Sequence, residues 1–170
     1  PGFFDIYVQN VVTKDIEKVF EYDGNCDPVT WLPDGEHLLV DMPENSLDQN
    51  MYQLNIKTGD MTKVGQEGAR YQSFTFTKDK KGGYALTDFG EETMYVSRFS
   101  IDNLESFEKV VHDPKWDVQE YKLTSDEQKL IYTVNEGGIY TLCIHDFSSQ
   151  ETKVVEGLPK GVIESLSWLN

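Results

Sequence analysis

Three histidines are the residues of this sequence best suited to acid–base chemistry, and two of them directly precede an aspartate. His112-Asp113 and His145-Asp146 each place an imidazole beside a carboxylate. Neighbouring residues of a strand point to opposite faces of a sheet, so neither pair is well placed to work as an acid–base dyad. We therefore expect structural or solvent-facing roles for all three histidines, His37 included.

Other residue spacings typical of metal or nucleophilic sites do not occur in the sequence. There is no Cys-x-x-Cys, His-x-x-His or Glu-x-x-His for zinc, and no Gly-x-Ser-x-Gly elbow for a serine nucleophile. The acidic run Asp23–Asp27 lacks the twelve-residue ligand ladder and closing Glu of an EF-hand loop, so we expect a linking turn there. Ser148 and Ser149 have no base placed near them. We assign no catalytic, cofactor-binding or metal-ligating residue.

The elements that would position such groups follow an internal repeat. Its fullest copy is the run 31–35, Trp-Leu-Pro-Asp-Gly, in which an apolar strand ends in a type I turn. Asp79 and Asp126 mark weaker copies. Asp79 follows Asp34 by 45 residues, and Asp126 follows Asp79 by 47. Apolar residues lie five and three positions before each Asp. Leu166 and Trp168 hold the same two places near the end of the chain.

Two further registers share this period. Ile/Met-Tyr pairs recur at spacings of 45, 43 and 45 residues, and Lys-Val pairs recur beside them. Each tyrosine opens an alternating segment of the kind expected for a half-buried strand. The pairs are Ile6-Tyr7, Met51-Tyr52, Met94-Tyr95 and Ile139-Tyr140, with Lys18-Val19, Lys63-Val64, Lys109-Val110 and Lys153-Val154.

The period predicts the architecture. Each unit contains four short strand signals and no helix signal, and four strands in about 40–50 residues are typical of a β-propeller blade. A two-sheet sandwich with evenly spaced hairpins is the alternative, but a sandwich does not require registers that repeat so closely. The sequence therefore predicts an all-β fold made of about four four-stranded blades, three of them complete.

The predicted domain is a partial propeller over residues 1–170, with a boundary between blades at each linker. Residues 3–20 are expected to form the last two strands of one blade, and residues 162–170 the first strand of another. Gly82-Gly83 and Gly137-Gly138 are expected in hairpin turns and not in a phosphate-binding loop. The three complete blades are expected at 27–66, 70–112 and 117–156.

This strand count leaves the blades as an open arc and not a closed ring. The opening strands and the final strand would share a blade without a second strand, which would leave backbone groups unpaired. Both ends therefore look cut from a longer propeller, and the run Pro1–Phe4 begins close to a strand with no leader-like segment. Uncovered blade faces lead us to expect that the isolated chain self-associates.

One aromatic residue stands outside the repeat. Trp116 follows Asp113-Pro114-Lys115 and breaks the register, so we single it out as a candidate surface or channel contact. Trp31, Trp168 and the repeat tyrosines are instead expected to pack between sheets, because each of them recurs in register.

Composition limits the partners. The 170 residues carry a net charge of −15, which argues against nucleic acid or an anionic membrane as a partner. No apolar run is long enough to span a membrane, and a cytoplasmic location is favoured without being fixed. Cys26 and Cys143 lie in different repeats, and we expect both to be reduced and partly buried. No cofactor is implied.

The repeat resembles that of TolB-like propellers. The resemblance rests on Trp-x-Pro-Asp-Gly at 31–35, an apolar strand, an Ile/Met-Tyr pair, Thr-Gly-Asp at 58–60 and Lys-Val. The same repeat occurs in the N-terminal propeller of prolyl oligopeptidase (S9) family serine peptidases. The Gly-His and Trp-Asp dipeptides typical of WD40 units are absent at equivalent places.

The resemblance implies a function without local catalysis. In such peptidases the propeller restricts entry to a separate α/β-hydrolase domain that carries the nucleophile, so the implied partner is that domain or a peptide or protein ligand. The alternative is a TolB-like scaffold for protein–protein interaction. A third hypothesis, an active site on the propeller itself, has the least support from the sequence.

Overall fold

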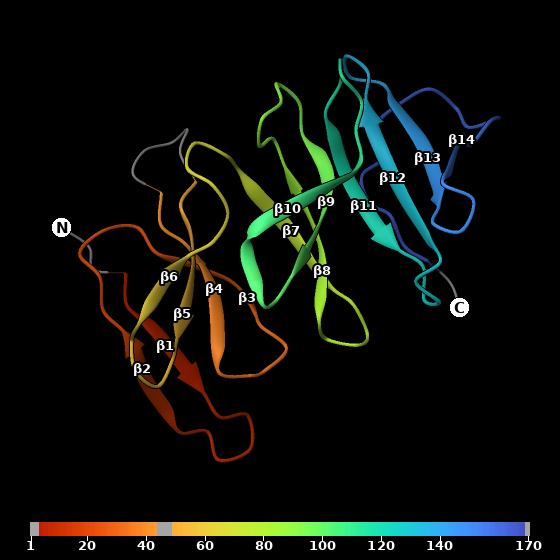
Figure 1. Ribbon diagram of the computed structural model, residues 1–170. Helices are drawn as coiled ribbons and strands as arrows, with labels where there is room; N and C mark the ends of the chain where they lie inside the picture. Colours follow the sequence, from red (N-terminus) through yellow and green to blue (C-terminus); the bar gives the residue numbers. More distant parts are fainter. Residues whose placement is uncertain (1–3, 44–48, 169–170) are drawn as a thin grey trace. The chain divides into compact units, whose positions relative to one another are not determined.

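Figure 1 shows the computed structural model, which describes residues 4–43 and 49–168. Within these residues the chain forms fourteen β-strands and no helix, which confirms the predicted all-β class. No helix long and apolar enough to cross a membrane therefore occurs in the described part. The strands make one two-stranded sheet and three four-stranded sheets, and in each sheet neighbours in space are neighbours in sequence.

Each predicted complete blade forms one four-stranded sheet. The two-stranded sheet pairs β1 (Ile6–Gln9) with β2 (Ile16–Phe20). The next contains β3 (Asp27–Trp31), β4 (His37–Asp41), β5 (Met51–Asn55) and β6 (Met61–Lys63). The third contains β7 (Tyr71–Phe76), β8 (Gly82–Thr87), β9 (Tyr95–Ser100) and β10 (Asn103–Val111). The last contains β11 (Val118–Leu123), β12 (Lys129–Asn135), β13 (Tyr140–Asp146) and β14 (Glu151–Val154).

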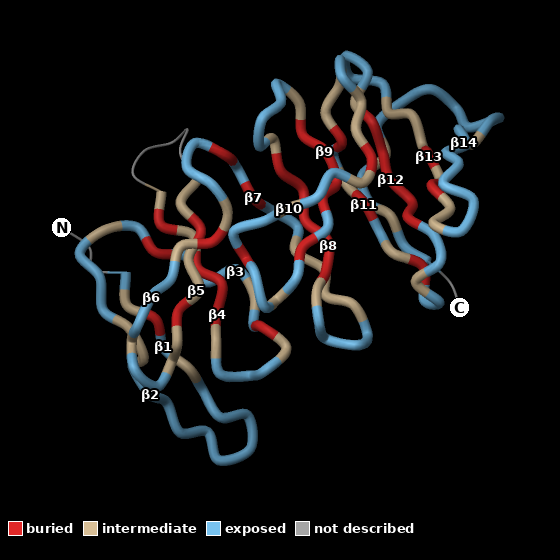
Figure 2. The backbone as a smooth tube through the Cα atoms, in the orientation of Figure 1, coloured by how far each residue is buried: buried red, intermediate tan, exposed pale blue. Residues whose placement is uncertain are grey.

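The chain divides into two compact units, Pro1–Tyr71 with Asp102–Ser106 and Gln72–Ile101 with Phe107–Asn170. Each unit has its own core where two sheets pack, visible as the red stretches of Figure 2. The first-unit core joins β1–β2 to β3–β6 and contains Ile6, Cys26, Leu38, Val40, Met42 and Leu54. The second-unit core joins β7–β10 to β11–β14 and contains Tyr84, Leu86, Met94, Val96, Val111, Val118, Tyr121, Leu130, Tyr132, Val134 and Cys143.

The aspartate of the repeat holds the turn between the first and second strands of a sheet. Thr77 donates its hydroxyl to Asp79 at 2.7 Å, and the same Asp79 oxygen accepts the Lys81 N–H at 3.0 Å. Thr124 and Asp126 repeat this arrangement at 2.6 Å. A threonine two positions before the Asp was not part of the predicted motif, although it recurs at the same spacing as Asp79 and Asp126.

The residue after each of these aspartates has a left-handed backbone. The φ angles are +71° at Gly35, +59° at Lys80 and +59° at Glu127. Only Gly35 adopts this conformation without a Cβ penalty, so the fullest sequence copy is also the one with the best-suited turn residue.

A second repeated turn joins the third and fourth strands of two four-stranded sheets, and the same turn joins β1 to β2 in the two-stranded sheet. The side-chain oxygen of Asn10 accepts the N–H groups of the residues two and three positions later, at 2.9 and 3.1 Å. Asn55 does so at 2.9 and 3.2 Å, and Asp146 at 2.9 and 3.2 Å. The residue four positions later then has positive φ, namely Lys14, Gly59 and Gln150. These turns fix an equivalent register in the three sheets.

The expected glycine turn at 82–83 is wrong, whereas Gly137-Gly138 does form a turn with positive φ at both residues. Gly82 and Gly83 begin β8 instead of preceding it. A Cβ at Gly82 would collide with the Phe99 carbonyl oxygen, and one at Gly83 with that of Thr75. The glycines therefore allow a close approach of neighbouring strands, and the turn falls at 78–81.

The expected final strand does not form within the described residues. Residues 162–168 have no ladder partner there, whereas a first strand becomes a strand by pairing with its second strand. The rest of that predicted segment, 169–170, and the predicted start at residues 1–3 lie outside the described residues.

The tyrosine register slips in the last sheet. Counted from the turn residues Asn55 and Asp146, the equivalent of Tyr52 is Cys143, and Tyr140 lies three positions earlier on the opposite face. Trp31 is also 42% exposed, less buried than its predicted packing role requires.

Candidate functional site

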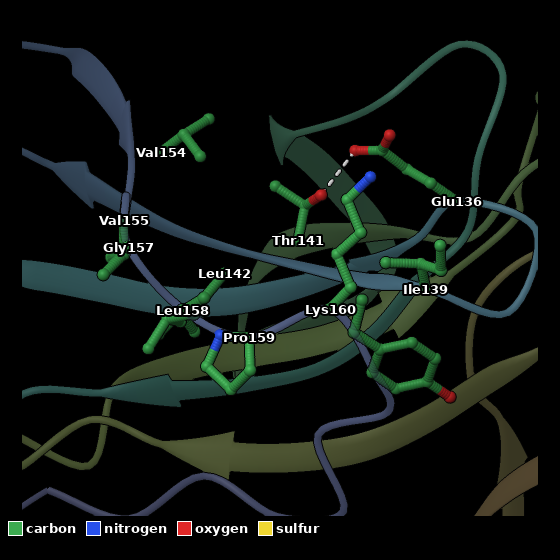
Figure 3. A pocket seen from close by; sticks show the side chains of 11 residues that line it. Glu136, Ile139, Thr141, Leu142, Val154, Val155, Gly157, Leu158, Pro159 and Lys160 are labelled. Carbon is green, nitrogen blue, oxygen red and sulfur yellow. Dashed lines mark hydrogen bonds between the residues drawn. The ribbon is translucent and has the colours of Figure 1, made fainter.

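A pocket of about 290 Å³ lies at the end of the last sheet, where β13 begins and β14 has ended. One wall is the β12–β13 turn and the start of β13, and the other is the chain that follows β14 (Figure 3). The Tyr140 N–H donates to the Gly161 carbonyl at 2.8 Å, which brings the departing chain back to β13. Gly157, with φ +81°, provides the bend.

The pocket combines an apolar lining with a polar rim. Ile139, Val154 and Leu158 are 42%, 57% and 49% exposed, so apolar side chains line it and still meet solvent. On the rim, the Thr141 hydroxyl donates to Glu136 Oε1 at 2.6 Å, and Figure 3 shows the Lys160 side chain extending along the same side. This arrangement can hold an apolar side chain and hydrogen-bond a polar group beside it.

Sequence reasoning did not find this pocket. Its residues come from a hairpin turn and from the linker 155–160, and the sequence pattern predicts both segments only as connections between strands. The available signal was the run Gly157-Leu158-Pro159-Lys160, in which an apolar residue and a proline follow a glycine.

Trp116 lies beside the turn that forms one wall of the pocket. Its ring packs against the second-unit core and is half-buried. Gly137 lies directly against its edge, and Lys115 Nζ lies over the ring at 4.7 Å from the centroid. One face of the indole is thus already occupied by a cation, and its candidate role as a surface or channel contact stays a prediction.

The structure separates each histidine from the aspartate that follows it in sequence. His112 Nε2 lies 3.1 Å from Thr93 Oγ1, whose proton goes to the Asp113 carbonyl at 2.7 Å, so the imidazole is the donor to the threonine. The Asp113 carboxylate instead accepts the Lys115 and Trp116 N–H groups at 2.9 and 3.0 Å.

His145 and Asp146 are held apart in the same way. His145 is buried, which lowers its pKa, and its Nδ1 lies 3.0 Å from Thr152 Oγ1. The Asp146 carboxylate holds its own turn and pairs with Lys129 at 3.0 Å. Hydrogen bonds from Ser148 and Lys129 hold the pKa of Asp146 well below its usual range.

His37 is part of the β3–β4 turn. Its Nδ1 lies 2.7 Å from Asp34 Oδ2, and its Nε2 lies 3.2 Å from Asn55 Nδ2. Because the Asn55 amide oxygen accepts backbone N–H groups, its NH₂ group faces the imidazole, which must accept there. The ring therefore donates from Nδ1 to Asp34 and connects two turns of one sheet.

Both cysteines are free and buried, as expected from the sequence. Burial raises the pKa of Cys26 to about 11, with the charges of Asp27 and Asp41 adding to the effect. Asp27 and Asp41 are themselves cross-strand partners on β3 and β4, and Asp41 Oδ1 is buried without a hydrogen-bond partner. Across the described residues, no group of three or more His, Cys, Asp or Glu side chains is arranged to hold a metal ion.

No protein-family model matches the sequence, and no curated protein matches it. Solved structures do resemble it. A prolyl endopeptidase matches with a TM-score of 0.68 and 19% identity over 92% of this chain and 24% of that one. TolB from Acinetobacter baumannii matches with a TM-score of 0.60 and 20% identity over 88% of this chain and 37% of that one. An oligogalacturonate lyase from Vibrio parahaemolyticus gives 0.58 and 14% over 89% and 46%.

The chain thus spans less than half the length of each of these three proteins. At such identities the likeness concerns the fold, and it agrees with the repeated four-stranded sheets: the chain has the fold of a β-propeller segment.

Proposed function

We propose that this chain is a non-catalytic propeller segment of a serine peptidase resembling the prolyl oligopeptidase family. In that role it limits which substrates reach a catalytic domain encoded elsewhere in the same polypeptide. The observation that carries the proposal is the match of 92% of the chain to 24% of a prolyl endopeptidase, with the highest TM-score of the three, 0.68. The sequence motif at 31–35 supports it independently.

The geometry is compatible with a wall that selects by size. The repeated turns are held by side-chain hydrogen bonds, and the sheets of each unit pack through apolar faces, which supports a role as a fixed wall. His37 and the turn aspartates Asp34 and Asp146 are engaged in these turns, and the imidazoles of His112 and His145 lie within hydrogen-bond distance of threonine hydroxyls, so all of them have structural roles in the wall.

Labelling the complete polypeptide with a fluorophosphonate probe tests the proposal, because such probes modify activated serines. We expect one modified serine outside residues 1–170, and hydrolysis of short chromogenic peptides in preference to folded proteins. Absence of labelling and of peptide hydrolysis would contradict the proposal. Measurable turnover by residues 1–170 alone would point to an active site on the sheets themselves.

The TolB likeness favours one alternative, a scaffold that binds a protein partner. A scaffold needs no activated serine in the complete polypeptide and should retain a folded partner in affinity capture with purified components. The labelling experiment therefore separates the two functions.

A further inference from the structure

The repeated turn at Asn10, Asn55 and Asp146 provides a common frame in which three sheets can be compared position by position. In each, the side-chain oxygen accepts the same two N–H groups, and the N–H four positions later donates to the backbone carbonyl at 2.9, 2.9 and 2.8 Å. Residues at equal distance from these turns therefore occupy equivalent places on the third strand, which is β1, β5 or β13.

One face of the third strand is buried wherever another sheet packs on it. This face holds the residues three and one positions before the turn residue and one position after it, because strand side chains alternate. In β5 they are Tyr52, Leu54 and Ile56, all of which belong to or pack against the first-unit core.

In β13 the same face meets the preceding sheet of its unit. Cys143 is a member of the second-unit core, and His145 is 5% exposed. Phe147 stacks on the ring of Tyr84 from β8, with centroids 5.6 Å apart. In both sheets, the residue after the turn residue is thus a large apolar side chain that contacts the sheet-to-sheet core.

In β1 the equivalent face is uncovered. Its residues are Tyr7, Gln9 and Val11; Tyr7 is 58% exposed and Val11 79%. The opposite face of β1 is the one that packs, because Ile6 lies in the first-unit core at 4% exposure. The β1–β2 sheet therefore packs through the face that carries Ile6, whereas the face equivalent to the packed faces of β5 and β13 is exposed to solvent.

We infer that the face formed by Tyr7, Gln9 and Val11 is an interface for one further four-stranded sheet of the same polypeptide. That sheet would present apolar second- and third-strand side chains, as β8 and β9 do with Tyr84, Leu86 and Val96. The similar solved chains have room for it, since this chain spans 37% of TolB and 24% of the prolyl endopeptidase. The inference does not depend on whether the polypeptide is a peptidase.

A neighbouring residue gives a matched control. Val12 is 84% exposed, but its equivalents Lys57 and Ser148 are solvent-exposed in the sheets that do have a neighbour. A covering sheet should therefore protect position 11 and leave position 12 open. The chain's own thiols give little background, because Cys26 and Cys143 are 3% and 6% exposed.

The test compares the reaction of Val11→Cys and Val12→Cys with a soluble thiol reagent, in residues 1–170 and in the complete polypeptide. In the 170-residue chain, at concentrations where it is monomeric, the two should react at similar rates, because both positions are exposed. In the complete polypeptide Val11→Cys should react roughly tenfold or more slowly than Val12→Cys, the factor given by an opening free energy of about 1.4 kcal/mol.

Equal rates at the two positions in the complete polypeptide would overturn the inference. So would an open reading frame that encodes no further strands of this repeat. If position 11 is instead protected in the 170-residue chain, and this protection disappears on dilution, the occupant is a second copy and the stated occupant is wrong.

Discussion

The two cores differ in the polar contacts that accompany their apolar packing. In the second-unit core two four-stranded sheets meet, and the Tyr121 hydroxyl lies 2.5 Å from the Ser73 carbonyl oxygen and 2.6 Å from that of Tyr84. In the first-unit core a four-stranded sheet meets only two strands. Asp41 lies on the opposite face of β4 from the core residues Leu38 and Val40, and its Oδ1 is buried without a hydrogen-bond partner. Among the described residues, buried oxygens without a hydrogen-bond partner occur in both units, Asp41 Oδ1 in the first and Thr133 Oγ1 in the second, so what distinguishes the second-unit core is its tyrosine bridge.

This difference shows what the repeat alone provides. Apolar alternation is present in both cores, but the tyrosine bridge meets the carbonyl of Ser73, a residue of β7 with an irregular positive φ of +57°. Burial also raises the pKa of Tyr121, which keeps its hydroxyl protonated as a donor. At Asp41, hydrogen bonds from the backbone of Asn50 and Met42 offset only part of the effect of burial on the carboxylate. We expect the second-unit core to be the more stable and the less adaptable of the two.

The largest expected effect is that of removing a fully buried leucine. Leu130 in the second-unit core is 0% exposed, and Leu130→Ala should lower the free energy of unfolding by about 2–5 kcal/mol. Leu54→Ala is the matched change in the first-unit core, also at 0% exposure. It should cost about 1 kcal/mol less, because the two-stranded neighbour can relax into the cavity. Urea unfolding followed by circular dichroism measures both, and an equal or larger loss for Leu54→Ala would contradict the comparison.

Tyr121→Phe removes the hydroxyl whose single proton is shared between the carbonyl oxygens of Ser73 and Tyr84. The expected loss is about 1–3 kcal/mol in the free energy of unfolding, since the site is buried. Tyr7→Phe is the control, because its hydroxyl is on an exposed side chain. A loss for Tyr121→Phe no greater than that for Tyr7→Phe would show that the bridge does not stabilise the second-unit core.

Asp41→Asn should stabilise the chain at neutral pH by about 1 kcal/mol, because it removes a charge from a poorly compensated site. Burial raises the pKa of Asp41 above its ordinary value of 3.8, and the charge of Asp27 adds to the shift. The folded state therefore binds this proton more tightly than the unfolded state does. The free energy of unfolding due to this group should rise as pH falls from neutral through the raised pKa, and level off below 3.8.

Chemical denaturation at several pH values checks this dependence. The difference in stability between Asp41→Asn and the original chain should shrink as the pH falls through the raised pKa. A difference that grows on acidification would mean that the carboxylate stabilises the folded chain.

The smallest expected effect concerns the residue that follows each turn aspartate. Lys80 has the left-handed backbone that Gly35 has in the equivalent turn, so Lys80→Gly should raise the free energy of unfolding by about 0.5–1 kcal/mol. The reciprocal change, Gly35→Lys, should lower it by a similar amount. Melting temperatures of the two variants measure this, and shifts of the same sign would show that the turns are not equivalent.

Much of the fold was predictable because its signals are local. Asp34, Asp79 and Asp126 each fix a turn through their own side chains, and the strand number and order follow from these turns. The Asn10, Asn55 and Asp146 turns could have been found as well, since the first two are spaced 45 residues apart. Asp146 differs in residue type, and this hid the third member.

The errors arose where a residue's role depends on its neighbours across the sheet. Gly82 and Gly83 look like turn residues, but close strand approach places them in β8. Tyr140 follows the tyrosine spacing, yet the short Gly137-Gly138 turn places it on the other face of its sheet. The pocket was missed for a similar reason, because a linker becomes a wall only when it returns to hydrogen-bond with β13.

Amide hydrogen exchange of the 170-residue chain, resolved by segment, tests the repeated four-stranded sheets most directly. The second and third strands of each four-stranded sheet lie between two paired neighbours, so their amides should exchange slowest, with the outer strands β6 and β14 faster. Slow exchange spread over the turns, or in residues 162–168 in place of these inner strands, would contradict the account.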